Sequence, residues 1–371
     1  MNSAPLKPTY VIPQLPPQGL ETVPILKALA PAHRYLAELK GAAQSIPNQG
    51  ILIDTLALQE AKASSEIENI VTTQDELFRA TLFPDGPASP DAKEVARYCK
   101  ALKAGFDFMQ STGGLLTNRA LIDMFRQLEQ RDDGFRRTPG TALKNEQTGE
   151  IVYVPPQEPD KIVKYMASLE CFINDDDLSD LDPLIKMALI HHQFESIHPF
   201  PDGNGRIGRI INVLYLTRSK LLSIPILYLS RHITQNKGDY YRLLQAVRDS
   251  DGEQADWEAW IVYVLTAVTE TAKLSLSIVN DLKVLMQETK IRVRTELSKM
   301  YSQDLINNLF RHPYTRIEYI ITDLGVSRPT ATKYLEQLVD AGILNKQVAG
   351  RNNYYINTPL VQLFLRVSGG E

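Results

Sequence analysis

Hydrophobic positions recur every three or four residues along most of this chain, a spacing that places them on one face of a helix. From Pro24 to Ile70 the sequence is alanine-rich, and the repeat runs through Leu52, Leu56, Gln59, Ala63 and Ile67. Further helices are predicted over about 91–110, 117–131, 182–196, 207–220 and 240–247. The pattern therefore predicts a mainly helical protein.

Two segments depart from the helical pattern. Residues 134 to 156 alternate around a Thr148-Gly149 turn and end in β-branched residues and prolines, which predicts a hairpin. Residues 1 to 20 are proline-rich and are expected to lie extended over the body of the protein. The helical pattern is broken by Pro84, Gly86, Pro87 and Pro90.

A different organisation begins near the C-terminus. Residues 270 to about 300 predict a long charged helix, a spacer or a dimerisation element. After Tyr301, a helix over 317–324, a Gly325-Val326-Ser327 turn and a helix over 328–341 capped by Ser327 form a helix-turn-helix pattern. Apolar and β-branched residues at 343–344 and 348–356 predict a β-wing, so the region resembles a winged-helix domain. The cations that would meet phosphates are Arg328, Lys333, Lys346 and Arg351.

The charge of this C-terminal region is a weak signal for DNA. Residues 311 to 357 hold six Lys/Arg and four Asp/Glu, and the whole chain has a net charge of −4. Protein docking or assembly through the same module stays an open alternative. The net charge also argues against nonspecific nucleic-acid binding by the molecule as a whole.

Composition places the chain among ordinary globular proteins. Hydrophobic residues make up 43% and charged residues 23%. The cysteines, Cys99 and Cys171, are expected to be buried, reduced thiols in helices. The N-terminus has no basic region followed by an apolar run, and no stretch approaches 18 uninterrupted apolar residues. A cytoplasmic location without a membrane span is the expectation.

The most informative stretch is HPFPDGNGRIGR, residues 198 to 209. Glycines at 203, 205 and 208 leave a bare backbone, whose amides with that of Asn204 can cradle an anion at a helix start. Arg206 and Arg209 share one face of that helix and suit a polyphosphate. Asp202 is suited to Mg²⁺ beside phosphate oxygens, and His198 titrates near neutral pH. These residue types predict a Mg²⁺–nucleotide site with a histidine base.

A zinc site at His191, His192 and His198 explains the stretch less well. No cysteine lies near, and the glycine–arginine run would be unexplained. His191 is expected to pack between helices, and His192 is expected to be exposed. Pro199 is expected to set the turn, and Phe200 to fill the core.

The stretch resembles the signature of Fic-domain proteins, HxFx(D/E)GNGRxxR, and every fixed position matches. The resemblance covers most of residues 1 to 270 and implies transfer of AMP from ATP to a Tyr, Thr or Ser hydroxyl of a protein, with release of pyrophosphate. It implies that His198 is the general base and that Asp202 holds Mg²⁺. It assigns Gly203, Asn204 and Gly205 to the α- and β-phosphates, Arg206 to the β-phosphate and Arg209 to the γ-phosphate.

The resemblance extends to two further sites. The hairpin corresponds to the flap of Fic proteins, whose exposed edge docks the target protein; Ile151, Val152, Tyr153 and Val154 would provide it here. A plain connecting hairpin is the alternative. Relatives place a tyrosine against the adenine, and Tyr240, then Tyr241, are the candidates, with core packing as the other interpretation.

A short acidic segment, SSEIEN at residues 64 to 69, has two interpretations. From the residues alone it is a helix end with a solvated acidic face, closed by Asn69 as a left-handed C-cap. Ser64, Glu68 and Asn69 also fit the Fic inhibitory motif, (S/T)xxxE(G/N). The resemblance implies that Glu68 competes with the γ-phosphate for Arg209, which misaligns bound ATP.

The predicted fold class is mainly α: a Fic helical core with a small β-hairpin flap, followed by a winged helix-turn-helix domain. The predicted parts are an N-terminal Fic-associated region with the inhibitory helix at about 52–69, a catalytic core, a helical linker and a winged-helix domain, over 1–100, 101–268, 269–300 and 301–371.

The predicted function is an autoinhibited protein adenylyltransferase that uses ATP and Mg²⁺. The alternatives are a nucleotide-sensing winged-helix transcriptional regulator, de-AMPylation by the same site, and a kinase-like or phosphocholine-transferring relative; Gly205 favours AMP transfer over the kinase-like form. The expected partners are ATP and a target protein with an accessible hydroxyl. The protein itself as target, DNA at the winged helix and a second copy in a homodimer are left open, and no membrane partner is expected.

Overall fold

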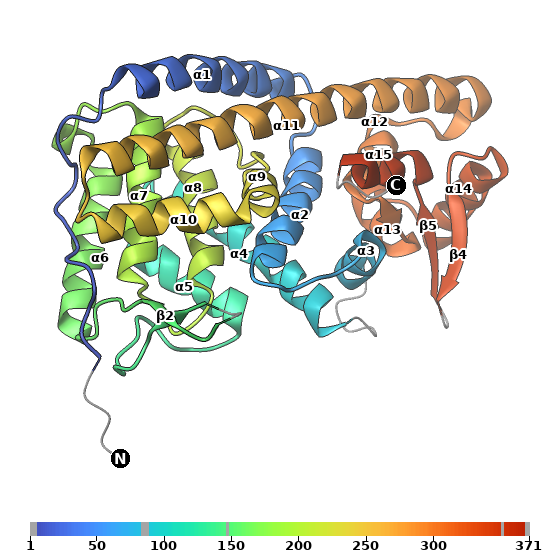
Figure 1. The fold of residues 1–371 in the computed structure, drawn as a ribbon. Coiled ribbons are helices and arrows are strands. Elements are labelled where there is room, and N and C mark those ends of the chain that lie inside the picture. Colours follow the sequence, from blue (N-terminus) through green and yellow to red (C-terminus); the bar gives the residue numbers. More distant parts are fainter. Residues whose placement is uncertain (1–5, 83–88, 146–147, 350–351, 368–371) are drawn as a thin grey trace.

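A computed structural model describes residues 6–82, 89–145, 148–349 and 352–367. Most of the described chain is helical, as the hydrophobic spacing predicted, with two small antiparallel sheets (Figure 1). A large helical body contains the hairpin, and a smaller C-terminal module lies at the far end of one long helix (Figure 1).

Two helices occupy the stretch for which continuous helical periodicity was predicted from Pro24 to Ile70. They are α1 (Val23–Gln44) and α2 (Gly50–Ile67). The break between them contains Pro47, which disfavours helical geometry in the residue before it. The five positions of the predicted repeat in α2 are all buried. Helix α1 lies along α11 (Gln254–Glu296), the longest helix of the protein (Figure 1).

The centre of the body is α7 (Pro183–Ile197), whose residues from Leu184 to Ile197 are all buried. It is enclosed by α6 (Pro159–Asn174), α8 (Asn204–Arg218), α10 (Lys237–Asp249) and α11. Asp182 caps the start of α7, since its carboxylate accepts a hydrogen bond from the amide of Leu184 at 2.8 Å.

The expectation that His192 is exposed is wrong. Because α7 is covered on all sides, His192 is fully buried. Its ring lies 4.6 Å from the ring of Trp257, and its Nε2 is 3.2 Å from the carbonyl oxygen of Leu244. His191 packs between helices as expected, with its ring stacked on Trp260 at 6.0 Å.

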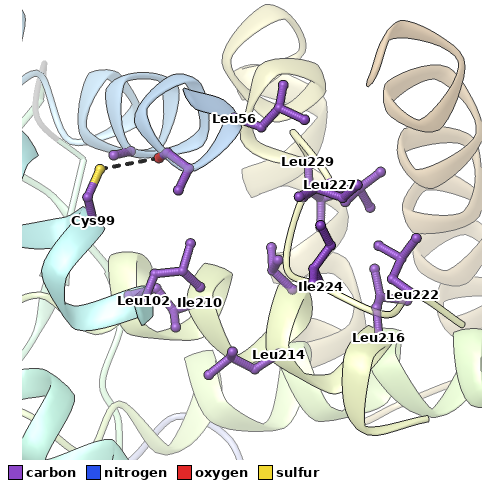
Figure 2. Close-up of a cluster of buried hydrophobic side chains, with 14 of the residues drawn as sticks. Leu56, Cys99, Leu102, Ile210, Leu214, Leu216, Leu222, Ile224, Leu227 and Leu229 are labelled. Atoms are coloured by element: carbon purple, nitrogen blue, oxygen red, sulfur yellow. Dashed lines mark hydrogen bonds between the residues drawn. The ribbon is translucent and has the colours of Figure 1, made fainter. Parts of the chain in front are cut away.

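The two cysteines differ in their surroundings. Cys99 is buried, as expected, and its thiol donates to the carbonyl of Ala57 at 3.4 Å, within the apolar cluster shown in Figure 2. Burial raises the pKa of Cys99 to about 12, so the thiol stays protonated at neutral pH. Cys171 is exposed, contrary to the expectation, because the buried face of α6 passes through Leu169, Phe172 and Ile173 and leaves position 171 outside.

Helices α4 (Pro90–Ser111) and α5 (Asn118–Glu129) begin within one residue of the predicted starts at 91 and 117. Two short helices, α3 (Gln74–Leu82) and α9 (Ser230–Gln235), were not predicted. Short 3₁₀ turns lie at Asp176–Leu178 and Ser298–Met300. Thr117 caps α5, and its hydroxyl accepts from the amide of Ala120 at 3.3 Å. The predicted breakers Pro84, Gly86 and Pro87 lie outside the described residues.

The predicted hairpin pairs β1 (Leu143–Lys144) with β2 (Ile151–Tyr153) in antiparallel register, and Gly149 in its turn has a φ of +73°. The proline-rich N-terminal segment runs extended along the body and reaches this hairpin. Thr9 donates its amide to the carbonyl of Val154 at 3.1 Å, and its hydroxyl accepts from the amide of Val154 at 3.1 Å.

The C-terminal module contains the helix–turn–helix order that was predicted. Its helices are α12 (Gln303–Arg311), α13 (Ile317–Leu324), α14 (Arg328–Asp340) and α15 (Thr358–Val367). Strands β3 (Tyr314–Thr315), β4 (Asn345–Ala349) and β5 (Asn352–Ile356) pair in the order β3-β5-β4. Arg328 and Lys346 form ion pairs with Glu318 and Glu336, and Arg351 lies outside the described residues.

Helix α11 joins the body to the module without interruption and crosses residue 268, where the sequence placed the end of the catalytic core. A window of α11 is long and apolar enough to cross a membrane by length and composition, which the search for uninterrupted apolar runs had missed. Within the protein 56% of that window is buried, as in the core helix of a globular protein.

A substitution at Gly105 can test the close packing of α4 against α5 and α8. A Cβ there would overlap the sulfur of Met124 and lie 2.8 Å from a methyl carbon of Leu214. We expect Gly105→Val to lower Tm, corresponding to a loss of about 1–3 kcal/mol of folding free energy. Gly41→Val, in an open part of α1, is the matched control and should change stability by less than about 0.5 kcal/mol. Equal melting of the two variants would contradict this packing.

Candidate active site

The stretch from 198 to 209 forms a tight loop between α7 and α8. His198 is the C-cap of α7 with a φ of +50°, a left-handed conformation that turns the chain out of the helix. The Asn204 side chain closes the loop: its oxygen accepts from the amide of Phe200 and its nitrogen donates to the carbonyl of Phe200, both at 2.8 Å. Phe200 is fully buried and stacks on Phe125 at 4.5 Å, as expected of a core residue. The loop is therefore held rigidly.

The start of α8 has the free backbone amides that the predicted anion cradle requires. Gly203 is its N-cap with a φ of +69°, and the amides of Asn204, Gly205 and Arg206 have no acceptor among the residues that the structure describes. Free amides at a helix start carry a partial positive charge that attracts phosphate. Asp202 is exposed beside them, and one of its carboxylate oxygens accepts from the amide of Gly203 at 2.7 Å.

His198 has a neutral ring at the edge of this cradle. Burial of the ring lowers the pKa of His198 to about 3, and the charges of Arg136 and Arg248 add to the effect. Its Nδ1 has no hydrogen-bond partner within the described part of the chain. An imidazole in this state is unprotonated at neutral pH and can accept a proton.

Arg209 is buried and is bound by residues at the end of α2. Its side chain is 1% exposed, and its Nη2 lies 2.8 Å from the Glu68 carboxylate. Its Nε donates to the hydroxyl of Ser64 at 2.7 Å, and Nη2 also donates to the carbonyl of Ser64 at 2.9 Å. The predicted neighbours Ser64 and Glu68 thus meet Arg209 across 141 residues of sequence or more.

The chain leaves α2 in a way that positions Glu68. Asn69 has a φ of +62°, the left-handed conformation that the sequence predicted for it. Burial by itself would raise the pKa of Glu68, but the charge of Arg209 and its hydrogen bond lower the pKa below the usual value. Burial would lower the pKa of Arg209, and Glu68 more than compensates, so both groups stay charged.

Arg206 is also held by carboxylates, which the sequence did not predict. It forms an ion pair with Glu94 of α4, and its Nη2 lies 2.8 Å from Glu129 of α5. The side chain of Arg206 is 4% exposed. Both arginines of the stretch are therefore paired with acidic side chains in this structure.

The three glycines lie where carboxylates approach the backbone. A Cβ at Gly203 would be 2.6 Å from an oxygen of Glu129, and one at Gly208 would be 2.5 Å from an oxygen of Glu195. At Gly205 a Cβ would overlap the carboxylate of Glu68 itself. The space that the sequence assigned to phosphates is thus also the space through which Glu68 reaches Arg209.

Glu195 adds an unexpected acid beneath the loop. It is buried, and one of its oxygens has no hydrogen-bond partner within the described residues. Burial raises the pKa of Glu195 to about 7, so a part of the population is protonated at neutral pH. The sequence feature that could have indicated Glu195 is the Phe-Glu-Ser-Ile run just before His198.

The two tyrosine candidates for the adenine differ in exposure. Tyr240 is buried, and its hydroxyl lies 2.8 Å from Nε2 of His191, so it is a core residue here. Tyr241 is 43% exposed, with its ring 5.0 Å from that of Tyr240. Which of the two tyrosines contacts an adenine stays a prediction.

The four flap positions are divided into two pairs. Ile151 and Val152 are 48% and 45% exposed, whereas Tyr153 and Val154 are buried. The hydroxyl of Tyr153 donates to the carbonyl of Ser196 at 2.6 Å, and the guanidinium of Arg248 lies 4.0 Å from the Tyr153 ring centre. Tyr153 therefore anchors the hairpin to α7, and only Ile151 and Val152 offer side chains to a partner.

Arg136 is a positioning residue that sequence reasoning missed. Its Nε donates to the carbonyl of His198 at 2.7 Å, its backbone amide donates to Pro199 at 2.8 Å, and Nη2 binds the carbonyl of Pro156. It thereby ties the end of the hairpin to the start of the loop. The Gly-Phe-Arg-Arg run at 134–137 contains this arginine, but from the sequence the run was interpreted only as part of the hairpin.

The buried histidines give a test of these surroundings. Because burial lowers the pKa values of His191, His192 and His198, all three should stay neutral as the pH falls from 8 to 5. His33 is the internal control, since its hydrogen bond to Asp182 raises its pKa above 6.5. The measurement is NMR of protein labelled with ¹³C-histidine, with the signals assigned by single substitutions. Of these four histidines, only His33 should change its ring chemical shift over this pH range. A His198 midpoint near 6.5 would contradict the described burial.

Three family models match this chain. Residues 26–107 match the Fic/DOC family N-terminal model, and residues 115–216 match the Fic/DOC family model. Residues 285–360 match the model of the C-terminal domain of SoFic-like protein adenylyltransferases. The stretch from 198 to 209 lies within the second of these matches.

Individual relatives are distant. The chain is 23% identical over 267 residues to a probable protein adenylyltransferase of Aquifex aeolicus, covering 69% of this chain and 72% of that protein. It is 28% identical over 98 residues to the protein adenylyltransferase fic-1 of Caenorhabditis briggsae, covering 26% of this chain. That match spans only 18% of the nematode protein's length.

Solved structures share the fold. A Fic family protein from Desulfovibrio desulfuricans G20 superposes with a TM-score of 0.57 at 21% identity, covering 95% of this chain and 98% of that one. A Fic domain containing signaling protein from Bacteroides thetaiotaomicron gives a TM-score of 0.54 at 20% identity, covering 67% of this chain and 97% of that one. The mainly helical fold with a small hairpin, the signature at 198–209 and the three family matches lead to one conclusion: the chain belongs to the Fic/DOC family.

Proposed function

We propose that this protein is a protein adenylyltransferase, which moves AMP from ATP to a hydroxyl group of a target protein and releases pyrophosphate. We further propose that Glu68 holds it in an inhibited state. One observation carries the second part: the Glu68 carboxylate is paired with Arg209 directly above the bare backbone of Gly205. The names of the relatives, which are protein adenylyltransferases, support the first part.

His198 would act as the general base. Its unprotonated ring takes the proton from the target hydroxyl as the hydroxyl oxygen bonds to the α-phosphorus of ATP. The bond from that phosphorus to the bridging oxygen breaks, and pyrophosphate leaves with the electron pair. The lowered pKa of His198 keeps the ring unprotonated across the neutral range. Catalysis otherwise depends on positioning and on neutralising the triphosphate.

The amides at the start of α8 and the two arginines would supply that neutralisation. Asp202 fits a Mg²⁺ ion held jointly by one carboxylate and phosphate oxygens, because it is exposed and one carboxylate oxygen accepts no hydrogen bond within the described residues. When bound, Mg²⁺ would offset the charge of the phosphates. Among the described residues no group of three or more His, Cys, Asp or Glu side chains could hold a metal without the nucleotide.

Inhibition would act through geometry. As long as Glu68 occupies Arg209, the γ-phosphate lacks its cationic partner, so ATP settles in a position in which the α-phosphorus is not aligned with the attacking hydroxyl. The buried guanidinium of Arg209 would bind either Glu68 or the γ-phosphate, one at a time. Charge-assisted hydrogen bonds in such a site are strong. Release of Glu68 is therefore the step that would activate the enzyme. The same glutamate could instead orient a water molecule that removes AMP, the de-AMPylation alternative.

The surfaces around the site suggest how partners would bind. A flexible target segment would meet the exposed Ile151 and Val152 of β2 and present its hydroxyl to His198. We assign the C-terminal module to the winged-helix class from its helix order and its β4–β5 hairpin. Ion pairing of Arg328 and Lys346 with acidic residues favours protein docking over DNA binding, and so disfavours the transcriptional-regulator alternative.

Removal of Glu68 tests both parts of the proposal. With Mg²⁺ and α-labelled ATP, Glu68→Gly should increase AMP transfer, including self-modification, by a factor on the order of 10², because the γ-phosphate regains Arg209. Glu66→Gly is the matched control: it removes an exposed carboxylate from the same helix end and should leave transfer at the wild-type level. Adding His198→Ala to Glu68→Gly should abolish transfer.

The position of the label separates the remaining outcomes. Label should reach protein from α-labelled ATP and not from γ-labelled ATP. Incorporation from the γ position would mean kinase-like chemistry, and equal incorporation by wild type and Glu68→Gly would end the inhibitory role of Glu68.

A further inference from the structure

A cavity of about 450 Å³ lies between the helical body and the C-terminal module, apart from the loop at 198–209. Its walls come from α2, α3 and α4 on one side and from the segment between α12 and α13 on the other. This volume falls in the range of small-molecule sites. No part of the proposed adenylyl transfer uses it.

The cavity is strongly basic. Lys93, Arg97, Lys100 and Lys103 of α4 line it together with Arg311 of α12, against a single carboxylate, that of Asp54. Five cations and one carboxylate give a formal charge of +4, in a protein whose net charge is −4. A concentration of one charge sign in a concave site focuses the field and attracts ligands of the opposite sign.

Three of the five cations have carboxylate partners: Lys103, Arg311 and Arg97, whose Nη2 lies 3.8 Å from Glu94. Asp54 is paired with Lys103 and lies 2.6 Å from Nε of Arg311, which joins the body to the module through one carboxylate. Lys93 and Lys100, seven positions apart and therefore on one face of α4, have no carboxylate within 4.0 Å among the described residues. These two ammonium groups are thus available to an anion.

The module contributes flat rings to the same cavity. Tyr314 stacks on Phe78 with centroids 5.3 Å apart, and Tyr319 lies 4.4 Å from the ring of His312. Burial lowers the pKa of His312 to about 4, so this ring is neutral at pH 7. Aromatic walls beside cations suit a ligand that has both a planar ring and phosphate groups.

We propose that this cavity is a second binding site, for a small organic phosphate with an aromatic ring such as a nucleoside diphosphate. Lys93 and Lys100 would bind the phosphates, and the rings of Phe78, Tyr314 and Tyr319 would contact the base. The ligand would touch α2 at Asp54 and Leu58, on the helix that ends in the Glu68–Arg209 pair. A volume of about 450 Å³ favours a small molecule over a nucleic-acid strand.

Hydrogen–deuterium exchange of the full chain with ADP and Mg²⁺ tests the site. ADP should protect peptides covering 90–103 and 311–319, in addition to the loop at 198–209. Lys93→Glu with Lys100→Glu should abolish protection of the first two regions and keep protection of the loop, which also verifies that the variant is folded. The matched control, Lys164→Glu with Lys283→Glu, exchanges two exposed lysines elsewhere and should behave as wild type.

Three outcomes would overturn the proposal, and a fourth would bear on the adenylyl transfer alone. Protection of the loop alone would show that the cavity binds no nucleotide, without affecting the proposed transfer. If pyrophosphate protected the cavity peptides as well as ADP does, the aromatic rings would not contribute to binding. If a single-stranded oligonucleotide protected these peptides and ADP did not, the cavity would be a nucleic-acid site. Loss of loop protection in wild type, with the cavity protected, would contradict the adenylyltransferase proposal and leave this site intact.

Discussion

A buried guanidinium needs an anion, and this requirement organises the site. Arg209 is almost completely removed from solvent, where an unpaired charge would be very costly. In this structure the anion is Glu68, and Arg209 donates two further hydrogen bonds to Ser64. With ATP bound, we propose that the γ-phosphate takes this role. The buried guanidinium of Arg209 would then have two alternative anionic partners, Glu68 and the γ-phosphate. Its charge would be balanced in either state.

The rest of the structure keeps Glu68 within reach of Arg209. Glu60, two turns before Glu68 in α2, is fully buried and accepts from the amide of Ser230 at 2.9 Å and from the hydroxyl of Tyr98 at 3.3 Å. Burial raises the pKa of Glu60 to about 6. This carboxylate fastens α2 to the start of α9 and to α4. Because Gly205 has no side chain, the carboxylate of Glu68 can then pass over α8 to the guanidinium.

The sequence predicted most helices, because the spacing of apolar residues reflects burial on one face. It also predicted the loop at 198–209, because local glycines, an asparagine and a histidine determine that geometry among themselves. It was wrong about His192, since α7 is buried on every side and carries no polar face for a pattern to reveal. Arg136, Glu94 and Glu129 were missed because each acts across a long stretch of sequence, where only the fold shows which groups meet.

The central claim is that Glu68 and the γ-phosphate compete for Arg209, and crystal structures with a non-hydrolysable ATP analogue and Mg²⁺ test it most directly. In Glu68→Gly, Arg209 should contact the γ-phosphate, and the α-phosphorus should face His198. In wild type, Arg209 should stay on Glu68 with the triphosphate displaced. If both proteins held the triphosphate in the same position, with Arg209 still turned to Ser64, the account would be contradicted.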